Sequence, residues 1–533
     1  MNLIRARMKA YIQPFERRLA LQELRAMALA EPRHLGLFEE TSTEFELTSS
    51  CSSAELANRL AYWESVESLN SSVITMQSLR ESTVHTARNG VALEMFGQHL
   101  PFNGEVPLPN RRCLRYGTHG IHEYRGKFFP QLVRSLINVS GTGKGGVVAD
   151  PMSGSGTTLV EGVLAGCHSL GNDMNPLSVF LGKVKCRLLS ADADRLMSSY
   201  EQVRKEIVGP PNGRSNRLIY FENLPLADQD YLGGWFSEDV LMSLDNICQV
   251  VGRVADADAR DLMRISISNI LRRVSLQKED DLRVRKESRP DADIDPRKEF
   301  LDEMTRSFRA VLAFLYQNGS VARDSFEVTH GDARRIEDKW KKSSVDVVIT
   351  SPPYATALPY LDTDRLSLCY LGLLPRPEHR TRDHLMIGNR EVTEGLRRVY
   401  WSQFENQGKT LPEAVRSLIN QIRDLNATAN VGFRRRNLPA LLAKYFFDMK
   451  ETIRGIYRVL KPRSFAFVVV GNNHTIAGGQ RVDILTASLL QDIAKQVGFH
   501  VADSLPMEML VSRDIFKKNA TASEEILALY KMG

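Results

Sequence analysis

The segment "VDVVITSPPY", residues 345–354, ends an apolar run with a serine, two prolines and a tyrosine. The run is rich in β-branched residues, so it predicts a buried strand. Pro352 and Pro353 have fixed φ angles and no N–H, so they predict a stiff corner without competing donors. Ser351 Oγ and the Pro352 carbonyl could then accept both N–H groups of an exocyclic amine, and Tyr354 could stack on the ring that carries it. The plainer alternative is a buried turn with a core tyrosine.

A glycine-rich loop lies between a predicted strand and a predicted helix in "VVADPMSGSGTT", residues 147–158. Gly154 and Gly156 let the backbone turn sharply and approach a ligand closely. The helix that follows would point its unpaired N–H groups at that ligand. The loop has neither the Gly-Lys-Ser/Thr of a P-loop nor the G-x-G-x-x-G of a dinucleotide fold, so neither of those ligand classes is indicated.

Two aspartates follow later strands of the same β/α pattern. Asp173 ends the strand in "HSLGND" and could accept both ribose hydroxyls of an adenosine that lies over the sheet edge. Asp332 follows the strand in "VTHGDAR" and could accept the adenine amino group. Taken alone, Asp173 would more simply cap a helix and Asp332 would form a turn. Together with the glycine loop, the two carboxylates predict a nucleoside site beyond the carboxyl ends of the strands.

These motifs resemble those of the S-adenosylmethionine-dependent amino-methyltransferases of DNA. "DPMSGSGTT" resembles the cofactor loop of that family, with Met152 in place of the usual Phe, and "TSPPY" resembles its catalytic motif. "GIHEYRGKFFPQLVRSLI" resembles the segment that closes over the methionine end of the cofactor. "YLDTDRLSLCYLGL", "IYRVLKPRSFAFVVVGNN" and "KKNATASEEILALY" resemble later motifs, although "KPRS" lacks the usual glycine pair. The resemblance covers residues 115–185, 325–375 and 440–533.

The resemblance implies a Rossmann-like α/β fold, in which helices flank a mostly parallel twisted sheet, with S-adenosyl-L-methionine as cofactor and no metal. It assigns catalysis to the corner formed by Ser351, Pro352, Pro353 and Tyr354. It assigns cofactor binding to Lys127, Phe128, Asp150, Pro151, Ser153, Gly154, Ser155, Gly156, Thr157, Asp173, Asn175, Asp332 and Ala333. Lys127 or a backbone N–H would hold the cofactor's carboxylate and Phe128 would pack on the ligand; the alternative there is a helix start with a packed aromatic.

The serine in the corner bears on the base that is methylated. Serine is typical of cytosine-N4 enzymes, whereas Asp or Asn at this position is commoner in adenine-N6 enzymes. The resemblance therefore implies transfer to cytosine N4 in duplex DNA, by base flipping and direct displacement. Adenine N6, guanine N2 of transfer RNA and a non-catalytic DNA-binding subunit are the alternatives. Carbon-5 methylation would need a Pro-Cys nucleophile, and none of the six cysteines follows a proline.

The pattern around the motifs predicts one α/β core interrupted twice. Runs of strand and helix mark the core, and charge-rich helical stretches mark the interruptions. The predicted segments are a helical N-terminal extension (1–110), core with the cofactor loop (111–190), a helical insertion (191–325), core with the catalytic corner (326–375), a basic insertion (376–440) and the C-terminal part of the core (441–533).

Charge suggests where DNA would bind. The chain has 533 residues and a net charge of +6, which permits a polyanionic partner. We favour the basic insertion over the helical insertion as the DNA-reading segment, because it follows the catalytic corner in sequence. A solvated helix face is the plainer explanation of each. The candidate residues are Arg434, Arg435 and Arg436 in the basic insertion (376–440), and Arg272, Arg273, Lys278, Arg283, Arg285, Lys286 and Arg289 in the helical insertion (191–325).

The remaining features bear on location and partners. No apolar run is long enough to span a bilayer, and the N-terminal residues lack the apolar region of a secretory signal. The cysteines form no CxxC pair, so a reducing cytoplasm is expected, with no membrane association. A restriction–modification or related bacterial system would supply a cognate restriction endonuclease or defence-system subunit as partner.

Overall fold

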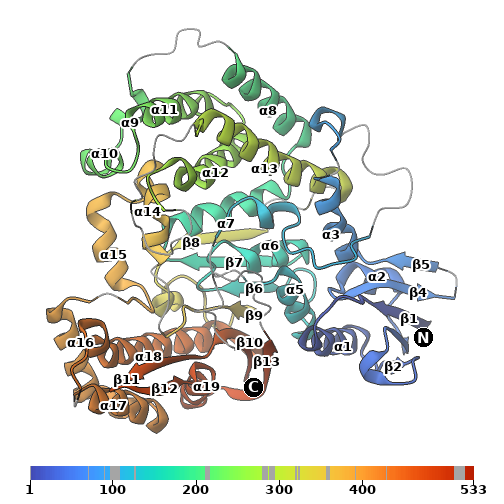
Figure 1. The fold of residues 1–533 in the computed structure, drawn as a ribbon. Helices are drawn as coiled ribbons and strands as arrows, with labels where there is room; N and C mark the ends of the chain where they lie inside the picture. The colour runs from blue at the N-terminus through green and yellow to red at the C-terminus, as the bar shows by residue number, and fades with distance from the viewer. Residues whose placement is uncertain are drawn as a thin grey trace.

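The computed structural model describes residues 2–69, 71–88, 90–96, 108–124, 128–209, 217–278, 286, 294–318, 321, 325–355, 360–390, 392–427, 429–508 and 523–533. Within these ranges, no helix combines the length and apolar character that crossing a membrane requires. The elements form an N-terminal α/β unit, a central sheet with helices on its faces, and a helical bundle (Figure 1).

The central sheet of the described chain has seven strands in the order β13-β14-β10-β9-β6-β7-β8. The five strands from β10 to β8 run parallel, and β14 runs antiparallel between β10 and β13. The strands are β6 (Val147–Asp150), β7 (His168–Asp173), β8 (Phe326–His330), β9 (Val345–Thr350), β10 (Leu460–Gly471), β13 (His500–Glu508) and β14 (Ser523–Lys531). This arrangement confirms the predicted, mostly parallel α/β core.

The order of the strands reverses beside β6. After β6 the chain adds β7 and β8 on one side of it, and then β9 and β10 on the other. In open α/β sheets, ligands bind beyond the carboxyl ends of the strands at such a point. The helices α6 (Thr157–Leu164) and α7 (Pro176–Leu188) make the crossovers on either side of β7.

Alternate residues of β9 pack on opposite faces of the sheet, as the pleat of a strand dictates. Val347 and Ile349 join the cluster that contains α1 (Pro14–Ala28) and α5 (Pro130–Val139). Val348 joins the cluster that contains α18 (Phe433–Val459) and α19 (Thr486–Val497), near the hairpin of β11 (Asn473–Ala477) and β12 (Gln480–Ile484). Because both faces are covered, the strand is apolar almost throughout, as the sequence indicated.

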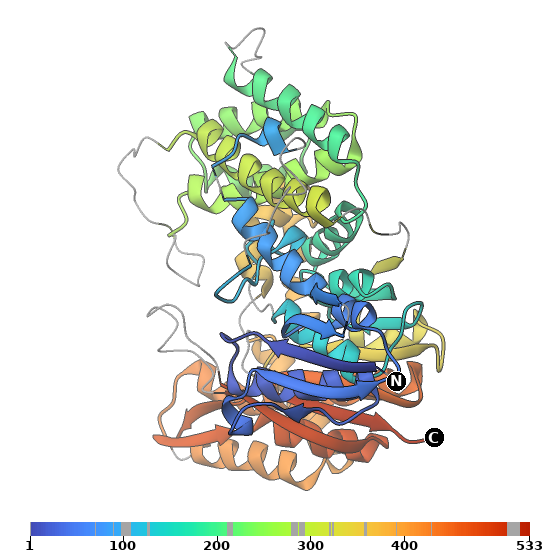
Figure 2. The ribbon, with the colours of Figure 1, turned by 90° about the vertical axis from the view of Figure 1, so that its right-hand side faces the viewer.

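The N-terminal extension is not mainly helical, which corrects the prediction for residues 1–110. Its described residues form a five-stranded sheet in the order β2-β3-β1-β4-β5, which lies beside the C-terminal strands in Figure 2. The elements are β1 (Asn2–Met8), β2 (Arg33–His34), η1 (Glu39–Thr41), β3 (Glu44–Ser49), α2 (Ser53–Arg59), β4 (Trp63–Ser68), β5 (Ser71–Ile74), α3 (Met76–Thr86), η2 (Leu93–Met95) and η3 (Gly117–Gly120), together with α1.

A period of two in β1 explains this difference. Ile4, Ala6 and Met8 are buried, whereas the arginines between them are exposed. Arg5 and Arg7 form cross-strand ion pairs with Glu46 and Glu44, at 3.2 and 2.9 Å. The basic, amphipathic character of this segment therefore belongs to a half-buried strand and not to a helix.

Both insertions are helical where the structure describes them. The first contains α8 (Ala193–Val208), α9 (Ile219–Glu222), α10 (Leu226–Gly233), α11 (Glu238–Gly252), α12 (Ala257–Val274) and α13 (Pro296–Asn318). After η4 (Ala333–Asp338) and α14 (Tyr360–Tyr370), the second contains η5 (Arg376–Glu378), α15 (His379–Leu385), α16 (Glu394–Gln407), η6 (Gly408–Thr410) and α17 (Glu413–Ala427). The predicted boundary at residue 440 is wrong, because it falls inside the continuous helix α18.

Candidate active site

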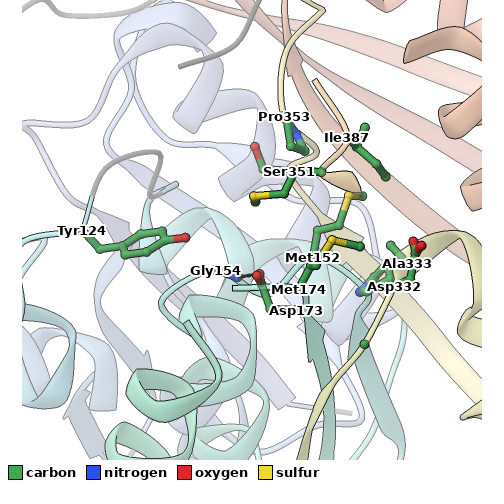
Figure 3. Close-up of a pocket in the computed structure, with 13 residues that line it drawn as sticks. Tyr124, Met152, Gly154, Asp173, Met174, Asp332, Ala333, Ser351, Pro353 and Ile387 are labelled. Atoms are coloured by element: carbon green, nitrogen blue, oxygen red, sulfur yellow. Dashed lines mark hydrogen bonds between the residues drawn. The ribbon is translucent and has the colours of Figure 1, made fainter. Parts of the chain in front are cut away.

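A pocket lies at the point where the strand order reverses (Figure 3). Most of its lining comes from the loops that follow β6, β7, β8 and β9, so separate stretches of the chain meet there. The lining residues are Tyr124, Pro151, Met152, Gly154, Asp173, Met174, Gly331, Asp332, Ala333, Ser351, Pro353, Met386 and Ile387. The structure thus brings together the predicted glycine loop, both predicted aspartates and the predicted catalytic corner.

The glycine loop needs glycine at two positions. Gly154 has a φ of +48° and Gly156 a φ of +83°, a region that other residues rarely adopt. A Cβ atom on Gly156 would also meet Gly182 Cα in α7 at 2.9 Å. The loop can therefore turn into α6 and pack closely on α7 only without side chains at these positions.

Asp150 lies beneath this loop and does not line the pocket. Its Oδ1 accepts a hydrogen bond from the Met152 N–H at 3.1 Å, and its Oδ2 accepts one from Thr158 Oγ1 at 3.0 Å. Burial raises the pKa of Asp150 to about 7. These contacts hold the loop in shape, and cofactor binding by Asp150 stays a prediction.

Asp173 forms part of the pocket wall and also fixes the glycine loop. Its Oδ2 accepts from the Gly154 N–H at 2.8 Å, and its Oδ1 accepts from the Asn175 N–H at 2.9 Å. The Met174 N–H and the Ser178 hydroxyl also donate to this carboxylate, which lines the pocket as an acceptor. Burial raises the pKa of Asp173 to about 6.

Asn175 serves a structural role and does not line the pocket. Its Oδ1 accepts from the Leu177 N–H at 3.0 Å and caps α7, while its Nδ2 donates to Asp364 at 2.9 Å. The cap is a typical use of asparagine before a helix. Cofactor binding by Asn175 stays a prediction.

Asp332 lines the pocket beside Ala333 and is held by Arg334. The Arg334 guanidinium donates to both carboxylate oxygens of Asp332, with a shortest distance of 2.6 Å, and to Asp448 in α18 at 2.8 Å. Burial alone would lower the pKa of Arg334, but these two acidic partners raise it. Arg334 also donates to the Leu385 carbonyl at 3.0 Å, next to the lining residues Met386 and Ile387.

Some residues of the corner after β9 line the pocket, and others pack in the core. Ser351 and Pro353 line the pocket, whereas Pro352 is buried. Tyr354 is partly buried, packs against the core cluster of α18 and donates its hydroxyl proton to Glu524 in β14. Burial raises the pKa of Glu524. Tyr354 is not among the lining residues, so its ring lies beside the pocket in this structure.

Some predicted cofactor residues stand apart from the pocket wall. Phe128 packs against the cluster of α1 and α5. Ser153, Ser155 and Thr157 are buried in the glycine loop and the start of α6. Lys127 lies outside the described residues.

Sequence reasoning missed several wall residues. Tyr124 belongs to the segment "GIHEYRGKFF", but only its neighbours were assigned roles; its hydroxyl forms a 2.8 Å hydrogen bond with Ser178 Oγ. Met174 directly follows Asp173, so its position was a usable signal. Met386 and Ile387 come from the basic insertion, and no local pattern links them to this pocket.

The residues present fit S-adenosyl-L-methionine. Methionine and isoleucine side chains form apolar wall for an adenine ring, and Asp173 and Asp332 offer acceptors for hydroxyl and amino groups. Within the described residues, Ser153 Oγ and Ser155 Oγ of the same loop are buried without a hydrogen-bond partner.

Comparisons with known proteins agree with this geometry. The family model UPF0020, described as "RMKL-like, methyltransferase domain", matches residues 122–207. The chain is 25% identical to the Type II methyltransferase M.MvaI of Kocuria varians over 442 residues, which cover 78% of this chain and 91% of that protein. It is 22% identical to the Type II methyltransferase M.BsoBI of Geobacillus stearothermophilus over 435 residues, covering 73% and 82%.

Solved structures are matched more distantly. The putative DNA modification methylase TTHA0409 of Thermus thermophilus, solved in complex with S-adenosyl-L-methionine, aligns with a TM-score of 0.20 and 18% identity over 38% of this chain and 54% of that one. TrmN of Thermus thermophilus aligns with a TM-score of 0.31 and 10% identity over 100% of both chains. Scores this low carry no argument by themselves. The strand order, the pocket and the similarity to the two methyltransferases together support a Rossmann-like methyltransferase with S-adenosyl-L-methionine as its cofactor.

Proposed function

We propose that this protein methylates the exocyclic N4 of cytosine in duplex DNA. The main support is that Asp173 and Asp332, which suit an adenosine, line the same pocket as Ser351 and Pro353. The similarity to Type II methyltransferases over most of the chain supports DNA as the substrate. The serine of the corner favours cytosine over adenine.

The corner would act by accepting hydrogen bonds from the amine. S-adenosyl-L-methionine, when bound, supplies a methyl group activated by its sulfonium. Ser351 Oγ and the Pro352 carbonyl would accept the two N–H groups of the cytosine amine, which localises the nitrogen lone pair. Because Pro352 and Pro353 have fixed φ angles, these acceptors are already in place before the base arrives, and such preorganisation is what electrostatic catalysis requires.

Tyr354 would support the extruded base. A base inside a duplex cannot reach the pocket, so it must leave the stack. Stacking on an aromatic ring contributes about 1–3 kcal/mol per base, which offsets part of the cost of extrusion. The hydrogen bond from the Tyr354 hydroxyl to Glu524 would hold the ring beside the pocket while the base enters.

Nucleoside mass spectrometry tests the choice of base. Duplex DNA incubated with the protein and labelled cofactor should contain N4-methylcytosine. N6-methyladenine in its place would move the assignment to adenine. A labelled-methyl competition between duplex DNA and transfer RNA separates both from the RNA alternative, because preferential labelling of the RNA would exclude DNA as the substrate.

Two variants separate the proposed roles. Tyr354→Ala should reduce methylation far more than it reduces cofactor binding, and Asp173→Ala should do the reverse. Calorimetry measures cofactor binding and methyl incorporation measures activity, both on duplex substrate. Equal losses in both measurements for both variants would contradict this division of roles.

A restriction endonuclease is the proposed partner. The two relatives are Type II methyltransferases, and such a methyltransferase would protect host DNA from a nuclease of the same specificity. DNA isolated from cells that express the protein should resist cleavage at the methylated sequence. If a restriction endonuclease with the same recognition sequence still cleaves that DNA, methylation does not protect it, and the partnership is contradicted.

A further inference from the structure

The basic insertion holds a second hollow, where α16, α17 and α18 meet. We call it the arginine hollow; it is lined by Arg397, Arg398, Trp401, Arg423, Arg436, Pro439 and Ala440. Residues 376–440 contain twelve Lys and Arg against seven Asp and Glu, a net charge of +5 out of +6 for the whole chain. The insertion therefore carries most of the chain's excess positive charge, as expected of a surface that binds a polyanion.

Acidic neighbours neutralise the arginine hollow only in part. Glu394 pairs with Arg398 at 2.7 Å and with Arg397 at 3.6 Å, and Asp424 pairs with Arg423 at 2.7 Å. The hydrogen bond from Arg398 and the positive charges of Arg398, Arg397 and Arg436 hold the pKa of Glu394 below its usual value. Several guanidinium groups thus converge on one exposed carboxylate, which leaves an excess of positive charge for a ligand.

The helices around the hollow are fixed to one another. Pro439 cannot donate a hydrogen bond to the Arg435 carbonyl one turn earlier, and the Asn426 amide of α17 donates to that carbonyl instead, at 2.9 Å. Trp401 packs against the core cluster of α18, and the Arg423 guanidinium lies over its ring, with Cζ 5.4 Å from the centroid. Arginines on such a rigid base lose less entropy when they bind.

The first insertion uses much of its positive charge internally. Arg273 pairs with Glu299 and Glu303, both at 3.3 Å, and Lys286 lies over the Trp235 ring at 5.5 Å. Arg283, Arg285 and Arg289, which the sequence also suggested, lie outside the described residues. Among the described residues, the basic insertion therefore offers the better polyanion surface.

The distance between the hollow and the pocket can be estimated along α18. Arg436 and Asp448 are twelve positions apart in this helix, which corresponds to about 18 Å. Asp448 holds Arg334, which holds Asp332 at the cofactor pocket. Figure 1 shows α15, α16 and α17 following one another along one side of the molecule.

We propose that the arginine hollow binds the DNA backbone within a few base pairs of the methylated base. The rise of about 18 Å between Arg436 and Asp448 is equivalent to about five base pairs at about 3.4 Å each, which sets the scale of this separation. A phosphate suits the hollow better than a base does, because arginine already covers the Trp401 ring and guanidinium groups match phosphate geometry. Such a contact would set affinity and register without reading sequence. This inference rests on the proposed function.

Salt dependence of DNA binding provides the first test. Fluorescence anisotropy with a labelled duplex gives the dissociation constant at several salt concentrations. Each lost phosphate contact should reduce the slope of log affinity against log salt by about 0.9. The double variant Arg398→Ala, Arg436→Ala should therefore bind more weakly, and its deficit relative to wild type should shrink about 12-fold between 50 and 200 mM salt.

Two matched variants serve as controls. Lys409→Ala removes one exposed positive charge from the same insertion but outside the hollow, and it should leave the slope near the wild-type value. Arg436→Lys keeps the charge and should retain most of the affinity, so it reports on the hollow even if the alanine variant is poorly folded. Equal slopes for the double variant and Lys409→Ala would overturn the proposal.

Neutral phosphates locate the contact. Duplexes with a single methylphosphonate placed two to eight base pairs from the target base are compared in binding to wild type and Arg436→Ala. A modification at one position in this range should weaken wild-type binding, and should matter much less in the variant. A loss of the same size in both proteins at every position would contradict the assignment.

Measurements on the wild-type protein separate a failure of the proposed function from a failure of the arginine hollow. If it transfers no methyl group to duplex DNA, the proposed function fails. If it methylates duplex DNA while the arginine variants keep the wild-type slope, only the arginine hollow is wrongly assigned. If transfer RNA displaces the duplex from wild type at lower concentration, the partner of the hollow is RNA and the proposal is overturned.

Discussion

Replacing Asp173 with asparagine should weaken cofactor binding strongly, although the two side chains have the same shape. In the structure, one carboxylate oxygen accepts from the Gly154 N–H at 2.8 Å and the other accepts from the Asn175 N–H at 2.9 Å. An asparagine amide has one acceptor oxygen and one NH₂ donor. Whichever way it is oriented, Asp173→Asn sets a donor against one of these two N–H groups.

The expected size follows from these bonds. An unpaired, partly buried N–H costs about 1–3 kcal/mol, and the loss of one charge-assisted bond to a ribose hydroxyl costs about 1.5–3 kcal/mol. The Gly154 N–H would be unpaired with and without the cofactor, so only the lost ribose bond weakens binding directly. A loss of about 1.5–3 kcal/mol raises the dissociation constant of S-adenosyl-L-methionine by about 10- to 100-fold. Asp173→Ala should fall within about tenfold of Asp173→Asn, because both lose the loop contact.

Isothermal titration calorimetry with S-adenosyl-L-methionine measures this effect. Glu327→Gln in the neighbouring strand β8 is the matched control, because it neutralises an exposed carboxylate and should bind the cofactor like wild type. If Asp173→Asn binds within threefold of wild type, then the carboxylate neither fixes the Gly154 loop nor binds the ribose as we argue.

Three further outcomes are expected. Burial raises the pKa of Asp173 to about 6, above its usual value, so the carboxylate is mostly ionised only above that pH. Cofactor affinity measured by calorimetry should therefore fall by up to about tenfold per pH unit below 6. The affinity of Asp173→Asn should not change over this pH range. Gly156→Ala should lower the free energy of unfolding in denaturant by about 1–2 kcal/mol for its φ of +83°, and by more because its Cβ meets Gly182. Tyr354→Phe removes the hydrogen-bond partner of the partly buried Glu524, so it should destabilise the fold by about 1 kcal/mol in thermal unfolding. Its methylation activity should stay within a few-fold of wild type. A loss of methylation as large as in Tyr354→Ala would show that the hydroxyl, and not the ring, supports the base.

The sequence predicted those parts of the pocket whose signal is local. Ser351 directly follows β9, Asp173 ends β7 and Gly154 lies in the loop after β6, so their motifs and their places in the sheet come from the same few residues. Parallel strands bring such positions to one edge, and the structure does so. The finer roles of Asp150 and Asn175 could not be predicted, because the direction in which a carboxylate or amide points depends on which N–H groups are nearest in the fold.

Long-range contacts account for what was missed. Met386 and Ile387 reach the pocket only because Arg334 and Lys444 hold the backbone carbonyls of Leu385 and Met386, at 3.0 and 3.2 Å. No local pattern encodes that contact. In β1, by contrast, the pattern was present but ambiguous, since alternating arginines and apolar residues in a short segment fit a strand or a helix face until the cross-strand glutamates are known.

Arg334 gives the basic insertion a physical route to the cofactor pocket. Its guanidinium joins Asp332 at the pocket wall, Asp448 in α18 and the carbonyl of Leu385, so these three groups cannot move independently without breaking charge-assisted bonds. If DNA bound at the N-terminal end of α18 and shifted this helix, the shift would therefore displace Asp332 in the pocket wall. Because binding linkage is reciprocal, DNA and cofactor would then alter each other's affinity by the same factor. Under these proposals, the insertion would be both a surface for the substrate and a part of the cofactor site.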